Sequence, residues 1–144
     1  MMLKIVLVVA AALFIAGIVL FIVWRHRPLF LDTEQFQRQW QGLQKLLRDK
    51  ARWADVVVDA DKLLDLALKK KHLKGGSMGE RLVKAQRLFT DNDGVWFGHK
   101  LRNRIDTDPT VKLKESEVKQ ALVGIRQGLK DIGALPNGQS GNQK

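Results

Sequence analysis

Residues 53–71, WADVVVDADKLLDLALKKK, form the clearest amphipathic pattern in the chain. Apolar side chains recur every three or four positions, a spacing that places them on one face of an α-helix. These side chains are Trp53, Val56, Val57, Ala60, Leu63, Leu64, Ala67 and Leu68. The charged residues off that face are Asp55, Asp59, Lys62, Asp65 and Lys69. We therefore predict a core helix of about 20 residues, which ends in lysines ahead of Gly75 and Gly76.

Four further segments are predicted to be helical, because each joins apolar residues at helical spacing to a start or stop signal. They cover residues 32–50, 77–89, 95–105 and 114–132. The first begins at Asp32 as N-cap, with Gln35 three positions later. Its apolar stripe consists of Phe36, Trp40, Leu43, Leu46 and Leu47. Because no strand pattern accompanies these segments, we predict an all-α fold, an up-and-down bundle of about four or five helices.

The glycine-rich turn at residues 75–80, GGSMGE, has two interpretations. A phosphate-binding loop follows a strand and ends in Gly-Lys-Ser or Gly-Lys-Thr, and this turn has neither feature. Ser77 with Glu80 three positions later favours a capping box that opens a helix. The acidic turn at residues 90–94 lacks the spacing and the closing glutamate of a calcium-binding EF-hand, so it too is predicted to be a cap and turn.

An apolar run of 20 residues, Ile5 to Trp24, precedes the helical segments. At about 1.5 Å per residue a helix of this length crosses the roughly 30 Å hydrocarbon core of a bilayer, and it exceeds the apolar part of a signal peptide. We therefore predict a single transmembrane helix. Lys4 precedes the run, while Arg25 and Arg27 follow it. This bias favours a single-pass protein of the cytoplasmic membrane, with the N-terminus outside and the C-terminal domain in the cytoplasm.

The predicted organisation has three parts: residues 1–27 as transmembrane anchor and basic flank, residues 28–135 as a cytoplasmic helical bundle, and residues 136–144 as a disordered polar tail. The chain has 25 Lys and Arg against 15 Asp and Glu. Such a basic domain attracts anionic lipid or nucleic acid, or has a well-solvated surface. Because the chain contains no cysteine, disulfides, thiol nucleophiles and cysteine zinc sites are excluded. We expect no metal and no cofactor.

Residues 96–109, WFGHKLRNRIDTDP, carry the side chains best suited to a functional site. Helical spacing divides them between two faces. The face expected to be core consists of Phe97, Leu101 and Ile105. The other face groups an aromatic ring, an imidazole and an amide, with cations beside them, so we predict a ligand or interaction cleft there. Its candidate residues are Trp96, His99, Arg102, Asn103 and Arg104.

The order Trp96-x-x-His99-Lys100-Leu101-Arg102-Asn103, late in a helical domain, resembles the higher eukaryotes and prokaryotes nucleotide-binding (HEPN) superfamily. The similarity extends to small single-pass bacterial proteins with such a domain behind a membrane helix. The resemblance implies a HEPN-like bundle and, for members with the full motif, a dimeric, metal-independent ribonuclease. Arg102 and Asn103 match the first half of that motif. The family histidine would fall at position 107, which is Thr107, so the resemblance implies a degenerate site.

Chemistry supports the same expectation. RNA cleavage by 2′-hydroxyl attack needs proton donors and acceptors that titrate near neutrality, and threonine does not. A rearranged pair of His99 and Asp106 is the remaining catalytic alternative. Otherwise, His99 is expected to be a hydrogen-bonded core or boundary residue, and Arg102 to form a salt bridge with a carboxylate such as Glu80 or Asp59. We predict no catalytic residue.

Three functions follow in order of preference. The first is a membrane-tethered helical scaffold or interaction module that binds a protein partner, a second copy included, and is not an enzyme. The second is a basic module that binds RNA or another phosphate-rich ligand at the membrane. The third is a divergent metal-independent HEPN ribonuclease.

Overall fold

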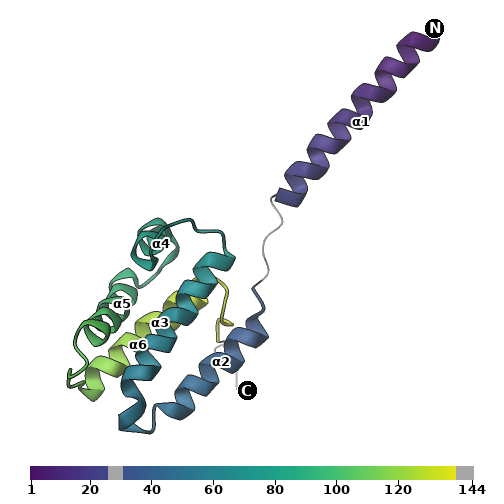
Figure 1. The fold of residues 1–144 in the computed structure, drawn as a ribbon. Helices are drawn as coiled ribbons and strands as arrows, with labels where there is room; N and C mark the ends of the chain where they lie inside the picture. The colour runs from purple at the N-terminus through teal and green to yellow at the C-terminus, as the bar shows by residue number, and fades with distance from the viewer. Residues whose placement is uncertain (26–30, 139–144) are drawn as a thin grey trace, which may run out of the picture. The chain divides into compact units, whose positions relative to one another are not determined.

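The computed structural model describes residues 1–25 and 31–138, and all regular structure in these ranges is helical (Figure 1). The elements are α1 (Met2–Arg25), α2 (Thr33–Leu46), η1 (Lys50–Arg52), α3 (Trp53–Lys70), α4 (Met78–Ala85), η2 (Gln86–Leu88), α5 (Asn92–Thr107) and α6 (Glu115–Asp131). The chain separates into two compact units, one with α1 and one with α2 to α6. The predicted boundary at Pro28, the flanking His26 and Arg27, and tail residues 139–144 lie outside the described residues.

Helix α1 is apolar over its whole length. The span from Met2 to Trp24 has a mean hydropathy of 3.3, and none of its residues is buried against the rest of the protein. A helix of 23 residues is about 34 Å long. By length and composition, α1 is therefore able to cross a membrane.

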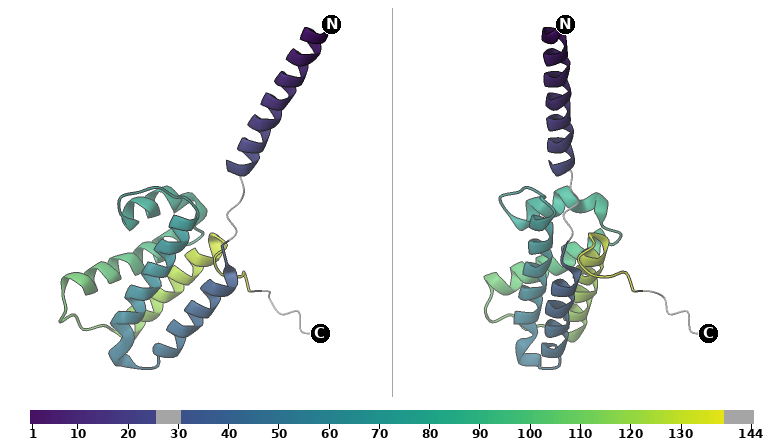
Figure 2. Two further views of the ribbon diagram at one scale, coloured as in Figure 1. Left: turned by 45° about the vertical axis from the view of Figure 1, so that its right-hand side comes forward. Right: turned by 90° about the vertical axis from the view of Figure 1, so that its right-hand side faces the viewer.

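Helix α3 lies at the centre of the second unit and contacts α2, α4, α5 and α6. Figure 2 shows α2 and α3 side by side in both views. The predicted core face is confirmed, since seven of its eight apolar residues are buried and Trp53 is partly buried. One prediction for α3 was incomplete, because Asp61 is also buried, with 2% of its surface exposed.

Side-chain caps determine where three helices begin. Asp32 accepts a hydrogen bond from the Gln35 amide at 3.0 Å, as predicted. Ser77 accepts one from the Glu80 amide at 3.2 Å, but the Glu80 carboxylate binds the amide of Gly76 at 2.6 Å, one residue before the position that a capping box requires. Helix α5, predicted to begin at Val95, begins at Asn92 because Asp91 caps it.

Helices α5 and α6 approach each other closely through glycines spaced four residues apart on each helix. A Cβ atom on Gly124 would lie 2.1 Å from the carbonyl oxygen of Gly94. A Cβ atom on Gly98 would lie 2.7 Å from Cγ1 of Ile125. The two backbones can be this close only because no side chain intervenes.

This contact turns α5 away from its predicted orientation. The buried residues of α5 are Val95, Gly98, His99 and Leu101. Phe97 and Ile105, which were expected in the core, are only partly buried. The prediction is confirmed for Leu101 and only in part for Phe97 and Ile105, which pack against the core without being buried in it. Gly98 was missed because glycine adds nothing to an apolar stripe, although its small size is what allows α6 to pack closely.

Helix α6 ends at Asp131, one residue before the predicted end, and Gly133 two residues later has a φ of +80°. Residues beyond that turn still belong to the core. Ala134 and Leu135 are buried, and the amide of Ala134 donates to the carbonyl of Leu129 at 2.8 Å. The C-terminal end of α6 is therefore held to the bundle by the chain that follows it.

Candidate functional site

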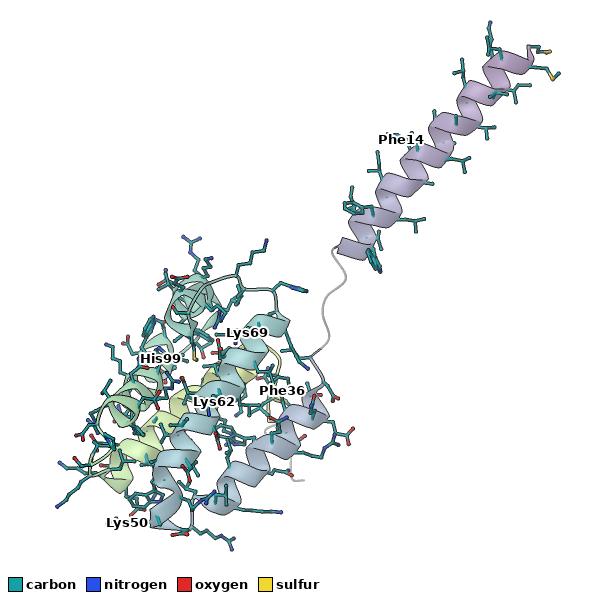
Figure 3. The ribbon with its side chains drawn as sticks, viewed as in Figure 1. Phe14, Phe36, Lys50, Lys62, Lys69 and His99 are labelled. Carbon is teal, nitrogen blue, oxygen red and sulfur yellow. The ribbon has the colours of Figure 1, made fainter. Side chains whose placement is uncertain are left out.

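A buried Asp–His pair joins α3 to α5. The Nδ1 atom of His99 lies 3.2 and 3.1 Å from the two carboxylate oxygens of Asp61. Because a carboxylate only accepts hydrogen bonds, Nδ1 carries the proton in this contact. His99 is 7% exposed and Asp61 is 2% exposed. His99, labelled in Figure 3, is therefore a hydrogen-bonded core residue. This confirms the expectation that it is a core or boundary residue.

Arg102 completes this network one helical turn after His99. Its Nε atom lies 3.8 Å from Oδ2 of Asp61, and its Nη2 atom lies 3.0 Å from Oδ2 of Asp106. Its Nη1 atom donates to the side chain of Asn103 at 3.1 Å. Arg102 forms the expected kind of ion pair, but the predicted partners were wrong.

The two predicted partners of Arg102 are engaged elsewhere. The carboxylate of Glu80 binds the amide of Gly76, and that of Asp59 lies 3.7 Å from Lys62. Asp59 was expected because it lies on the charged face of α3. Asp61 is two residues further and therefore about 200° around the helix, on the face that meets α5.

Trp96 packs against the outer side of His99. The two rings meet edge to face, with centroids 5.8 Å apart and an interplanar angle of 76°. Gly79 lies opposite, and a Cβ atom there would be 3.9 Å from Nε2 of His99 and 4.0 Å from Cη2 of Trp96. The start of α4 therefore closes over the imidazole.

The structure brings only part of the predicted cleft together. Trp96 contacts His99, and His99 and Arg102 both face Asp61. Asn103 is exposed and accepts a hydrogen bond from Arg102. Arg104 belongs to a different contact, because its Nη2 atom lies 2.9 Å from Oε1 of Glu117 on α6.

Two acidic residues of α3 that sequence analysis did not single out anchor this region. Asp61 has a recognisable signal, since its spacing from Val57, Leu64 and Leu68 belongs to the buried stripe. Asp65 was expected to face solvent, and this prediction was wrong, because the side chain is only 16% exposed and receives two hydrogen bonds from Arg81, at 2.6 and 3.0 Å.

The Arg81 contact changes the acidity of Asp65. Burial raises the pKa of the Asp65 carboxyl, but the hydrogen bonds from Arg81 and Lys69 together lower it by more than burial raises it. The resulting pKa lies below the usual value for aspartate. Arg81 also donates to the carbonyl of Gly75 at 2.6 Å. Asp65 therefore positions Arg81, which binds the turn before α4. The first turn of α4, which contains Gly79 beside His99, is held in place in the same way.

The side chains of this network make their contacts within the bundle. Thr107 donates its hydroxyl to the carbonyl of Asn103 at 3.0 Å, within its own helix. Across residues 1–25 and 31–138, no group of three or more His, Cys, Asp and Glu side chains is placed to hold a metal ion. The contacts of Asp61, His99 and Arg102 join helices to one another.

A groove between α2 and α3 is the more open feature. Its volume is about 630 Å³. It is lined by Gln39, Gly42, Leu43, Lys45, Leu46, Asp59, Lys62, Leu63 and Leu66. Leu46 was predicted to be in the core, but it is 37% exposed in this groove, and Leu66 is 38% exposed. The correction arises because α2 ends at Leu46, so this side chain lies beside the core and not within it.

Comparison with known proteins finds no protein-family model, curated protein or solved structure that matches this chain. The HEPN-like interpretation therefore rests on Arg102, Asn103 and the helical pattern around them. Function has to be argued from the surfaces and side chains of the chain itself.

Proposed function

We propose that this protein is a membrane-tethered helical interaction module, with α1 as the anchor and the α2–α3 groove as the binding surface. The groove carries the proposal, because it exposes leucines in a region where the fold leaves room for another chain. The proposal includes a HEPN-like ancestry whose catalytic function is lost, which the residues Arg102, Asn103 and Thr107 motivate.

The groove has the chemistry of a protein-binding site. Leu46 and Leu66 expose apolar surface beside Leu43 and Leu63. Because each is only 37–38% exposed, covering it with a partner contributes roughly 0.5–1 kcal/mol, about a third of the value for a fully exposed leucine. Gly42 lies in the middle of α2 and lines the same groove, and a Cβ atom there would meet nothing within 4 Å. A glycine that no internal contact requires leaves the backbone of α2 open to close approach by a partner.

Binding of RNA through the predicted cleft has less support. Arg102 and Arg104 both form ion pairs with carboxylates of the bundle, whereas the exposed Lys100 beside them forms none among the described residues. Phosphate contacts rely on cations that can exchange water for phosphate oxygens. We therefore place a protein partner ahead of RNA and ahead of catalysis.

Site-specific photo-crosslinking in intact membranes tests the proposal. A photoreactive phenylalanine derivative is introduced in place of Leu66 in the full-length chain, and in place of Val123 as the control. Val123 is 66% exposed on α6 and lies outside the groove. We expect one defined crosslinked polypeptide from position 66, lost on Leu46→Glu, and none from position 123. Equal labelling from both positions contradicts the proposal.

A further inference from the structure

Residues 69–74, KKKHLK, form a basic segment that the proposed binding groove does not use. The segment contains four lysines and one histidine and no acidic residue. All five of these side chains are exposed, and only Leu73 packs against the core. We refer to residues 69–74 as the basic segment.

The basic segment lies at the end of the bundle where the chain arrives from α1. Helices α2 and α3 are antiparallel, and the Nζ atom of Lys70 lies 5.8 Å from the centroid of the Phe36 ring. Phe36 is in the first turn of α2, and Leu31, the first described residue of this unit, is buried in the same core. Figure 3 shows Lys69 and Phe36 at this end of the bundle, and Lys50 at the other.

Covalent geometry limits how far this end can be from the end of α1. Five residues, 26–30, separate Arg25 from Leu31. Even a fully extended chain covers at most about 3.6 Å per residue, so six steps span about 22 Å. If α1 crosses a membrane, this tether is short enough to let the basic segment reach the lipid headgroups, where its charges interact with them within about one Debye length, about 8 Å.

The charge of the basic segment is largely uncompensated within the bundle. Lys69 lies 2.9 Å from Asp65, whereas Lys70, Lys71 and Lys74 form no salt bridge in the part of the chain that the structure describes. Favourable interaction with the helix macrodipole explains cations in the last turn of α3 but not Lys74, which lies beyond it.

The backbone of the basic segment is strained at His72. His72 has a φ of +59°, at a helix-terminating position where glycine is usual. A side chain in this left-handed region costs about 1 kcal/mol. The turn between Lys71 and Leu73 is therefore formed at the expense of backbone strain at His72.

We propose that the basic segment binds the anionic headgroups of the lipid leaflet that α1 enters, and so holds this end of the bundle against the membrane. The inference rests on the proposed membrane anchoring by α1. Each lysine near an anionic leaflet contributes about 1 kcal/mol, which is about a fivefold preference for the bound state. The ligand is the net anionic surface of the lipid leaflet, not a soluble phosphate.

Amine footprinting of the full-length protein in nanodiscs tests this inference. One nanodisc preparation contains phosphatidylcholine alone, and the other contains phosphatidylcholine with phosphatidylglycerol. Lysines are modified with an amine-reactive ester, and the rate at each position is read by mass spectrometry. Lys50 and Lys112 are the internal controls, since they line one pocket at the opposite end of the bundle.

We expect modification of Lys70, Lys71 and Lys74 to slow about fivefold in the anionic nanodiscs, with Lys50 and Lys112 unchanged. The protection should disappear in about 1 M salt, where the Debye length is about 3 Å. Equal rates in the two lipids overturn the inference. Protection that requires added RNA, in either lipid, also overturns it and identifies a nucleic-acid surface. Inorganic phosphate that protects in zwitterionic nanodiscs likewise overturns it.

Matched charge reversals provide the second test. Lys70→Glu with Lys71→Glu is compared with Lys50→Glu with Lys112→Glu, so that both variants lose the same charge. Each also removes one cation–aromatic contact, Lys70 over Phe36 or Lys50 over Trp53. Only the first variant should lose protection of Lys74. Failure of the wild-type protein to enter nanodiscs would instead refute the anchor, which separates the two proposals.

Discussion

Asp61 on α3 and His99 on α5 are joined by a buried hydrogen bond although 38 residues separate them in the chain. Asp61→Ala leaves the buried N–H of His99 without its acceptor, so we expect it to lower the free energy of unfolding by about 2 kcal/mol. Urea denaturation of the detergent-solubilised protein measures this. Asp59→Ala is the control on the exposed face of α3, where the expected change is within about 0.5 kcal/mol. Similar losses in both variants would contradict a role for the buried pair.

The contact of Asp65 with Arg81 predicts a pH dependence. The folded-state pKa of Asp65 lies below its usual value, so its stabilising effect is complete above the unfolded pKa, near 3.8, and is lost as the pH falls through the folded-state pKa. Asp65→Asn should therefore be about 2 kcal/mol less stable at pH 7 and lose less stability than the wild type below about pH 4. Urea midpoints between pH 7 and pH 2 measure both effects. Parallel curves for the two proteins would refute the assignment.

The glycine contact between α5 and α6 predicts opposite effects of the same substitution at two helical positions. Gly124→Ala places a methyl group 2.1 Å from a backbone oxygen and should destabilise the fold by about 3 kcal/mol. Gly42→Ala meets open space and should stabilise it by about 0.5–1 kcal/mol, because alanine favours the helix. Thermal unfolding of both variants tests the pair, and a stable Gly124→Ala protein would contradict the close backbone approach.

Strain at His72 predicts a stabilising substitution. His72→Gly removes the side chain from a left-handed conformation and should raise the free energy of unfolding by about 1 kcal/mol. Lys71 has a φ of −82°, so Lys71→Gly serves as the control and should give no gain. Urea titration distinguishes the two. A gain in both variants would mean that the effect does not come from backbone strain.

Absence of catalysis is also open to measurement. We expect the purified full-length protein to leave a labelled RNA intact, because Thr107, where the proposed HEPN-like resemblance would place a histidine, cannot supply acid–base chemistry near neutral pH. Arg102→Ala is the control for trace contamination, since a contaminating nuclease is indifferent to it. Reproducible cleavage that Arg102→Ala abolishes would overturn this prediction.

Sequence patterns predicted the helices well where a helix has a local start signal and a continuous apolar face. Asp32 and Ser77 illustrate this, since each caps the helix that it was expected to open. The cap and turn predicted for residues 90–94 contains the N-cap Asp91, but the helix begins at Asn92, three residues before the predicted start. Caps are predictable from sequence because the capping side chain and the amide that it accepts from lie within one helical turn of each other.

The candidate site was predicted less well, because its contacts join residues far apart in the chain. Spacing alone showed that His99 and Arg102 lie close on one helix, but not that both turn toward Asp61. Acidic residues were assigned to the surface by type, so the buried stripe position of Asp61 was overlooked. The partner of Arg81 left no local signal at all.

The close packing at Gly124 also restricts how this protein can change over time. Every other amino acid carries a Cβ atom, and any Cβ at this position would overlap the backbone of Gly94. Exposed positions such as Val123 can vary while Gly124 cannot, whatever mutations arise in its codon. A glycine at this position, four residues before another, should therefore persist in diverged descendants after overall sequence similarity has faded, and it offers a marker for recognising them.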